Sequence, residues 1–250
     1  MDQMERWKGK VALVTGASSG IGRATAVVLA REGMKVAVAA RRLERLEALA
    51  KELEAGGAQV LPIQCDLEQH EDIHRMWDTV RKQWGGVDVL INNAGLGWGG
   101  ATFNRTDREF QQMANVNLVA VAINTREAMK DMQKRDESYI IAISSMGGHR
   151  ISGRGNTFYG GTKHGVCAFV EGVRMELAAR ESPIKVGLIS PGTVATEIQA
   201  VGSRGKTDAS KRAREPMEAE DIADMVRYML ACPPRVQIHD ILVRPRFSAT

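Results

Sequence analysis

The chain has 250 residues, of which 44% are apolar, and its 34 Lys and Arg against 30 Asp and Glu give a formal net charge of +4. This length and apolar content fit one α/β domain with a substantial core, and they argue against a disordered chain. The weak, dispersed positive charge does not favour nucleic acid as a partner.

Apolar runs of strand length alternate with stretches of helical periodicity along the whole chain. The expected strands are Lys10–Thr15, Lys35–Ala40, Val60–Cys65, Val87–Asn92, Tyr139–Ser144, Ile184–Ser190 and Gln237–Val243. The expected helices are Gly20–Ala30, Arg42–Ala55, Asp66–Trp84, Thr106–Lys134, Thr157–Arg180 and Pro216–Leu230. Continuous apolar strands joined by such helices predict a single α/β domain over residues 1–250, with a parallel, doubly wound sheet and helices on both faces. Pro62 predicts an edge position for the third strand.

The first strand and helix are joined by a glycine turn, with Gly16, Gly20 and Gly22 in the spacing G-x-x-x-G-x-G. The N–H groups and the dipole at the start of a helix favour an anion. Gly16 can take a turn conformation that a Cβ would resist, Gly20 lets the chain approach a pyrophosphate, and Gly22 lets the helix pack closely on the strand. We therefore predict a dinucleotide site; a glycine turn without a ligand is the alternative.

The residues after the second expected strand favour NADP over NAD. Folds that bind NAD place an acidic residue about 20 residues after the glycine turn, where it holds the ribose hydroxyls. Here Ala40 is followed by Arg41 and Arg42. A guanidinium pairs with a 2′-phosphate that a carboxylate would repel. The alternative is that these arginines only begin the charged face of the next helix.

Other polar residues also follow expected strands. Ser19 adds a hydroxyl beside Gly20, and Asp66 can accept from an adenine amino group, cap the next helix, or do both. The carboxyl ends of parallel strands share one edge of the sheet, where ligands bind. The candidates at this edge are Thr15–Gly22, Ala40–Arg42, Asp66, Asn92–Gly95, Ser144–Ser145 and Pro191–Gly192.

Tyr159 and Lys163 form the candidate acid–base pair. They stand four residues apart in an expected helix, so the phenol and the ammonium share a face. We expect Lys163, a positively charged nicotinamide ring and partial desolvation to bring the pKa of the phenol from about 10 to about 7. Such a tyrosine protonates a carbonyl oxygen as hydride arrives, or takes the proton in reverse. A helix-surface pair without chemistry is the alternative.

Two further residues complete the candidate chemistry. Ser145 follows the fifth strand and can donate to a substrate oxygen, or simply cap the strand. Asn117 lies in an apolar helical stretch, where asparagine is a poor helix former and a buried amide needs partners. It either holds a water bonded to Lys163 in a proton relay or marks a structural kink.

These motifs in this order resemble the short-chain dehydrogenase/reductase superfamily over roughly Lys10–Pro245. The resemblance implies a Rossmann fold with seven strands in the order 3-2-1-4-5-6-7, and homodimers or homotetramers. It also implies a catalytic tetrad of Asn117, Ser145, Tyr159 and Lys163. The cofactor positions expected from the motifs and the resemblance are Gly16, Ser18, Ser19, Gly20, Ile21, Gly22, Arg41, Arg42, Asp66, Leu67, Asn93, Ala94, Gly95, Val116, Tyr159, Lys163, Pro191, Gly192, Val194 and Thr196.

Three segments carry a closer likeness. Met4–Trp7, Ser145–Arg150 and Gln237–Pro245 are similar to the animal SDR family member 11 group and to insect farnesol dehydrogenases. That likeness implies NADP-dependent conversion of steroid or isoprenoid alcohols and ketones. The alternatives are a 3-oxoacyl thioester or general carbonyl reductase, and a sensor that binds NADP without turnover.

The substrate is less well defined by the residues. An apolar cleft is expected from Trp98, Met146, Ile151, Phe158 and Val194, with ordinary loop packing as the alternative. Residues 193–215 are expected to form a lid over it. Within them, the basic stretch Ser203–Arg214 is interpreted as a solvated mobile loop, with a phosphate or membrane contact as the less favoured reading.

Cys65, Cys167 and Cys232 are widely spaced, and no C-x-x-C occurs. We interpret them as reduced core thiols of a cytoplasmic protein, and we expect no disulfide and no metal site. The first residues carry acids without an apolar stretch, so no secretory signal is expected. No apolar run approaches membrane-spanning length, so no stable membrane insertion is expected either.

Overall fold

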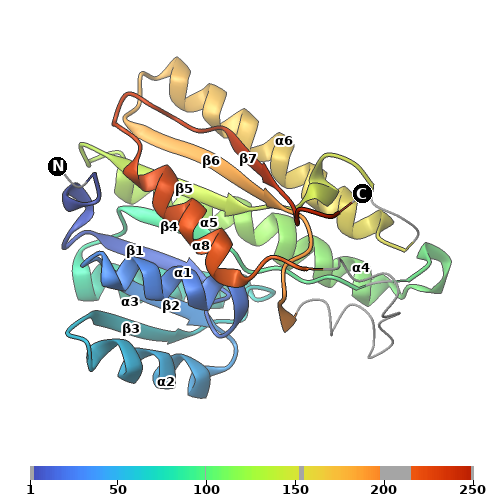
Figure 1. Ribbon diagram of the computed structural model, residues 1–250, viewed down its shortest axis with the longest axis horizontal. Helices are drawn as coiled ribbons and strands as arrows, with labels where there is room; N and C mark the ends of the chain where they lie inside the picture. The colour runs from blue at the N-terminus through green and yellow to red at the C-terminus, as the bar shows by residue number, and fades with distance from the viewer. Residues whose placement is uncertain (1–2, 99, 152–154, 198–214, 249–250) are drawn as a thin grey trace.

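The computed structural model describes residues 3–98, 100–151, 155–197 and 215–248. Seven parallel strands form one sheet in the order β3-β2-β1-β4-β5-β6-β7 (Figure 1). The strands are β1 Val11–Thr15, β2 Lys35–Ala40, β3 Gln59–Gln64, β4 Val89–Asn92, β5 Ser138–Ile143, β6 Ile184–Pro191 and β7 Asp240–Val243. The predicted fold and strand order are confirmed.

Helices cover both faces of the sheet (Figure 1). One buried apolar cluster joins the sheet to α1, α2 and α8, and a second joins its other face to α3, α5 and α6. The α-helices are α1 Gly20–Arg31, α2 Leu43–Glu54, α3 His70–Trp84, α4 Asp107–Ala114, α5 Ala120–Met132, α6 Thr157–Ala179 and α8 Ala219–Ala231. Short 3₁₀ turns lie at Glu5–Trp7, Thr102–Asn104 and Met146–Gly148.

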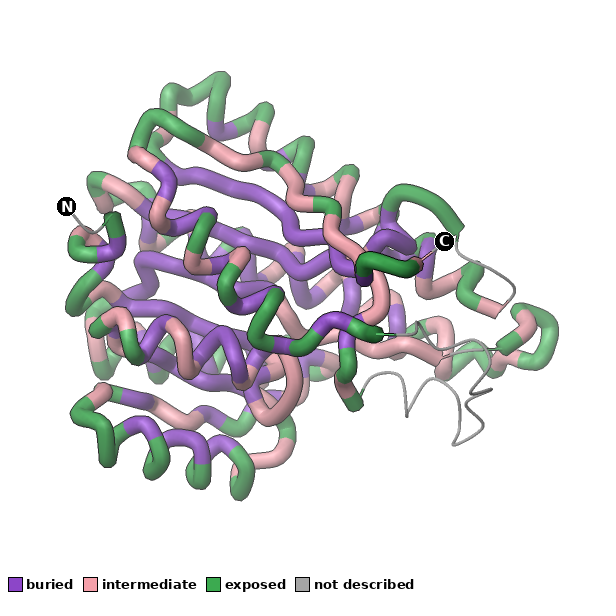
Figure 2. Tube along the Cα trace, viewed as in Figure 1, coloured by how far each residue is buried: buried purple, intermediate pink, exposed green. Residues whose placement is uncertain are grey.

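Burial follows the position of each strand (Figure 2). Every residue of β1 and of β5 is buried, because helices cover both sides of these central strands. β3 lies at the edge and is exposed at both its ends, so the edge position predicted from Pro62 is confirmed. Among the described residues, no helix combines the length and the apolar character that crossing a bilayer requires.

Several expected element boundaries differ from those of the structure; the helix expected from Pro216 begins at Ala219, and the strand expected from Val87 begins at Val89. The helix expected from Asp66 begins instead at His70, after Gln69. Asp66 does not cap it, because Oδ1 of Asp66 accepts the N–H of Glu68 at 3.1 Å in a local turn. The last strand begins at Asp240 rather than at Gln237.

The long helix expected over Thr106–Lys134 is interrupted near its middle. α4 and α5 are joined by a π-helical turn, Asn115–Val119, in which backbone hydrogen bonds skip one more residue than in an α-helix. Asn117 lies in this turn, is fully buried, and bonds to the backbone of Leu96 rather than to the helix. A π turn thus lies where the sequence analysis allowed either a proton relay or a structural kink.

Candidate active site

The carboxyl ends of the central strands bring the predicted residues to one edge of the sheet. β1 pairs with β2 and β4, and β5 pairs with β4 and β6, all in parallel register. The segment after β4 is bonded to the end of β1. The N–H groups of Asn93 and Ala94 donate to Thr15 Oγ1 at 3.0 and 3.2 Å, and Asn93 Nδ2 donates to Thr15 O at 2.8 Å. These bonds hold the segment after β4 against Thr15, the residue that precedes the glycine turn.

The glycines of the turn are required where the backbone comes closest. Gly16 has φ +69°, and an added Cβ would lie 2.8 Å from Ala94 Cα. At Gly22 an added Cβ would lie 2.5 Å from both Gly16 O and Asn93 Nδ2. Gly20 has φ +53°, and Thr196 approaches its Cβ position to 3.0 Å. The turn conformation of Gly16 and the close packing of Gly22 therefore agree with the prediction.

The first turn of α1 presents the positive end of a helix to this edge. Ser19 is the N-cap residue, but its side chain makes no capping bond, and the first turn carries no acidic residue. Both features leave the first N–H groups suited to an anion. Ser19 Oγ is instead 3.0 Å from Arg42 Nη2.

Arg42, rather than Arg41, lies beside the glycine turn. The Arg42 guanidinium donates to Ser18 Oγ and Ser19 Oγ, each at 3.0 Å. Arg41 is exposed, and its carbonyl oxygen accepts from Gln64 Nε2. The two arginines, which the sequence treats alike, are therefore distinct in space.

Glu197 is a charged residue of this region that the sequence analysis missed. Its carboxylate pairs with Arg42 Nη2 at 2.9 Å and with Arg45 Nη1 at 2.7 Å. Bonds from Arg45 and then Arg42 lower the pKa of Glu197 to about 2. More than 150 residues separate the partners, so no local spacing could have indicated the contact.

Lys163 and Tyr159 lie on the first two turns of α6. Lys163 is 4% exposed, its Nζ donates to Ile143 O at 2.9 Å, and its Nζ is 5.9 Å from the centre of the Tyr159 ring. Burial lowers the pKa of the Lys163 ammonium to about 8.

The protein's own groups shift the pKa of the Tyr159 phenol in the direction opposite to the one expected for Lys163, a nicotinamide ring and desolvation acting together. Burial raises the pKa of the Tyr159 phenol, because it disfavours the charged phenolate, and a hydrogen bond with Ser145 opposes this shift. Desolvation therefore acts against the lowering that the sequence analysis attributed to it. Tyr159 keeps its proton at neutral pH, in the form that donates.

Ser145 is held by the 3₁₀ turn Met146–Gly148. Its Oγ accepts the N–H of Gly147 at 3.0 Å and is also hydrogen-bonded to Tyr159. Gly147 is packed against both groups, since an added Cβ would lie 3.3 Å from Ser145 Oγ and 3.6 Å from the Tyr159 ring. The serine and tyrosine hydroxyls thus face the same point.

Asn117 lies close to the Tyr159–Lys163 pair and contacts the residue between them, Thr162. Its Oδ1 accepts from Leu96 N at 2.7 Å, and its Nδ2 donates to Leu96 O at 2.8 Å and to Thr162 Oγ1 at 3.1 Å. Its Oδ1 and Lys163 Nζ both approach the Cβ position of Gly95, to 3.5 and 3.6 Å. Thr162, between Tyr159 and Lys163, is a partner that the sequence analysis did not name.

Four of the remaining expected cofactor positions follow β6 or lie on the π turn. Gly192 follows β6, and its N–H donates to Val243 O at 2.7 Å. Val194 is 5% exposed and pairs with Met217, while Thr196 packs on Gly20. Val116, on the π turn, is 8% exposed.

The expected substrate-lining residues divide into two groups. Met146 and Val194 are buried, and Phe158 packs on Phe110 with ring centres 4.7 Å apart. Ile151 is 50% exposed. Of the expected lid, residues 198–214 lie outside the described part of the chain, and with them the whole of the basic stretch Ser203–Arg214.

Comparisons with known proteins agree with this geometry. The family model described as short chain dehydrogenase matches residues 10–206. The chain is 42% identical over 255 residues to dehydrogenase/reductase SDR family member 11 of Bos taurus, covering 99% of this chain and 100% of that one. It is 38% identical over 252 residues to a farnesol dehydrogenase of Aedes aegypti, covering 97% and 98%.

Solved structures give the same result. An alcohol dehydrogenase from the archaeon Thermococcus sibiricus, solved with 5-hydroxy-NADP, matches with a TM-score of 0.85 and 29% identity over 96% of this chain and 98% of that one. A serine dehydrogenase solved with NADP⁺ matches with a TM-score of 0.88 and 28% identity, over 96% of each chain. The seven-stranded sheet, the glycine turn and the family match agree, and the chain belongs to the short-chain dehydrogenase/reductase family of oxidoreductases.

Proposed function

We propose that this protein is an NADP-dependent oxidoreductase that interconverts an alcohol and its ketone or aldehyde. The observation that carries the proposal is the meeting of the Tyr159 and Ser145 hydroxyls beside the buried Lys163, at the edge of the sheet that holds the glycine turn. A protein that only sensed NADP would have no need of this set of donors.

The residues present fit a dinucleotide with a 2′-phosphate. Gly16 and Gly20 leave a cradle without Cβ atoms at the start of α1, where N–H groups favour a pyrophosphate. Arg42, with Ser18 and Ser19, offers a cation and two hydroxyls beside that cradle. The acceptor groups of Asp66 and the backbone of Leu67 are proposed for the adenine. When bound, NADP supplies or accepts the hydride.

Each catalytic residue then has a separate task. Tyr159 donates its proton to the substrate oxygen during reduction, and its raised pKa keeps that proton in place until it is needed. The Ser145 hydroxyl donates to the same oxygen and stabilises the charge that develops there. Lys163 places a cation near the phenol, which favours the phenolate after proton transfer. Asn117 holds the backbone of Leu96 and positions Thr162 beside the pair.

The proposed substrate is a bulky apolar alcohol or carbonyl compound, such as an isoprenoid or a steroid. Met146 lies in the turn after Ser145, Phe158 precedes Tyr159 on α6, and Val194 follows β6; these apolar side chains are the proposed substrate contacts. The similarity to a farnesol dehydrogenase supports an isoprenoid. A lid formed by residues 193–215 is part of this proposal.

The test is carbonyl-dependent oxidation of NADPH, followed by absorbance, with wild-type protein and the Tyr159→Phe variant. We expect Tyr159→Phe to bind NADPH with nearly unchanged affinity and to lose most turnover. Tyr228→Phe is the matched control, because Tyr228 is 60% exposed on α8. If Tyr159→Phe turned over at the wild-type rate, Tyr159 would not be the acid–base residue.

A panel of substrates decides between the remaining alternatives. Farnesal, a ketosteroid, a 3-oxoacyl thioester and a small ketone would be offered with NADPH and with NADH. We expect the highest kcat/KM with one of the bulky apolar compounds and NADPH. Tight NADPH binding without oxidation by any compound would instead favour the sensor.

A further inference from the structure

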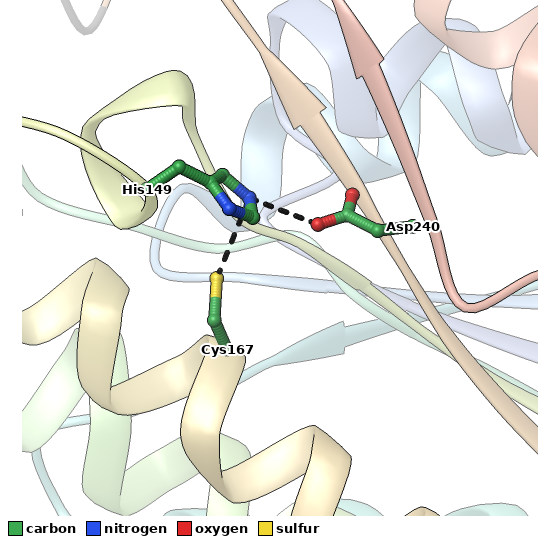
Figure 3. Close-up of side chains that lie close together, drawn as sticks. All are labelled: His149, Cys167 and Asp240. Carbon is green, nitrogen blue, oxygen red and sulfur yellow. Dashed lines mark hydrogen bonds and ion pairs between the residues drawn. The ribbon is translucent and has the colours of Figure 1, made fainter.

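We propose that His149, Cys167 and Asp240 form a binding site for a thiophilic divalent cation such as Zn²⁺. The three residues come from separate elements: the end of the 3₁₀ turn after Ser145, the middle of α6, and the first residue of β7. Their ligand atoms all lie within 4.8 Å of one another (Figure 3). The sequence analysis expected no metal site, because the cysteines are widely spaced and no C-x-x-C occurs.

One nitrogen of the imidazole faces both other groups. His149 Nε2 lies 2.9 Å from Asp240 Oδ2 and 3.8 Å from Cys167 Sγ. In a proton relay that activates a thiol, the carboxylate and the nucleophile contact opposite nitrogens of the ring. Here both groups lie on the side of Nε2, which is also 3.0 Å from Ser190 Oγ, so the geometry is not that of a relay and leaves the three side chains facing one common point.

The separations suit a tetrahedral zinc ion. Bond lengths of about 2.0–2.1 Å to nitrogen, about 2.0–2.2 Å to oxygen and about 2.3 Å to sulfur place tetrahedral ligand atoms about 3.4 to 3.6 Å apart. The two distances from Nε2 bracket this range, and all three ligand atoms lie within 4.8 Å of one another, so side-chain movements of about 1 Å would close the site around the ion. A thiolate and an imidazole favour zinc over magnesium or calcium, which prefer oxygen ligands.

The charges of the site also match a divalent cation. The Asp240 carboxylate and a Cys167 thiolate together neutralise two positive charges, and binding releases the proton of the thiol. Ser190 Oγ donates to Asp240 Oδ2 at 3.1 Å and orients the carboxylate, as outer groups do around metal sites.

The site is reachable from solvent and adjoins the 3₁₀ turn Met146–Gly148, which follows Ser145. His149 is exposed, while Cys167 and Asp240 are half-buried. Gly148 makes the approach possible, since an added Cβ would lie 2.9 Å from Cys167 Sγ and 2.8 Å from Ser144 Oγ. A bound cation would tie the turn that holds Ser145 to both α6 and β7.

The test is a titration of chelator-treated full-length protein with Co²⁺, which reports thiolate ligation by charge-transfer absorption in the near ultraviolet. We expect one Co²⁺ per chain with this band, and its loss when Zn²⁺ is added. Cys167→Ser should lose the band. Cys232→Ser is the matched control, because Cys232 is a free thiol just after α8 and outside the cluster, and it should keep the band.

Two further variants keep the test decisive if Cys167→Ser does not fold. His149→Gln and Asp240→Asn should each weaken Co²⁺ binding at least tenfold, and each should reduce the rise in melting temperature that Zn²⁺ gives the wild type. A wild type without a thiolate band overturns the proposal. So does a band of equal strength in Cys167→Ser, or a Zn²⁺ effect on melting that is unchanged in His149→Gln. None of these readouts depends on the proposed activity.

Discussion

Replacing Arg42 by leucine tests the assignment of the cofactor. Arg42 lies beside Ser18 and Ser19 at the start of α1, and its side chain is 39% exposed. A hydrogen bond to a charged group contributes about 1.5–3 kcal/mol, and the partial exposure of Arg42 places it near the lower value. About 1.5 kcal/mol corresponds to an increase of about tenfold in the Kd for NADPH.

The assay is titration of nicotinamide fluorescence with NADPH and, separately, with NADH. NADH has no 2′-phosphate, so the loss of Arg42 should remove only weak, exposed contacts with it. The Kd for NADH should therefore change less than about twofold. Arg41→Leu is the matched control, because it removes the same charge from the adjacent exposed position. Equal weakening of both cofactors by Arg42→Leu, or a larger effect from Arg41→Leu, would refute the assignment.

Three other substitutions test the energetics around the site. Glu197→Gln frees Arg42 from a part-exposed ion pair worth about 0.2–1 kcal/mol. The Kd for NADPH should therefore fall up to about fivefold, while the Kd for NADH stays constant. An equal change in both Kd values would contradict this expectation. Gly22→Ala places a Cβ 2.5 Å from Gly16 O and should cost about 1–3 kcal/mol in urea unfolding, whereas Gly172→Ala, which meets open space on α6, should not destabilise. Lys163→Met removes a buried amine whose pKa falls from 10.5 to about 8. Between these values the unfolded chain binds more protons, so the wild type should gain unfolding free energy relative to Lys163→Met from pH 7 to pH 10; a difference independent of pH would show that Lys163 does not titrate in this range.

Much of the architecture follows from local pattern. The alternation of apolar strands and amphipathic helices predicts the parallel sheet, and Pro62 predicts its edge, because both depend on neighbouring residues alone. Part of the candidate catalytic set is predictable for a related reason, since Tyr159 and Lys163 share a helix and Ser145 follows a strand whose carboxyl end lies at the same edge of the sheet. Asn117 lies instead in the π turn between α4 and α5, and its contacts with Leu96 and Thr162 depend on the fold.

The rest depends on contacts between distant segments. Arg41 and Arg42 are equivalent as a pattern, and the fold alone directs Arg42 to Ser18 and Ser19. Glu197 reaches these arginines only because the segment after β6 crosses the start of α1. The direction of the pKa shift of Tyr159 likewise depends on how deeply the fold buries the phenol. The spacing of Tyr159 and Lys163 in the sequence does not reveal that burial.

The π turn at Asn115–Val119 also has a consequence for insertions and deletions. It lets α4 contact α6, where Phe110 meets Phe158, while α5 faces β4 and β5. Removing one residue from the turn would rotate α5 by about 100° relative to α4. With the sequence of α5 unchanged, this rotation would turn the exposed side chains Arg126 and Lys130 toward the sheet. The number of residues in this segment is therefore constrained more tightly than their identity.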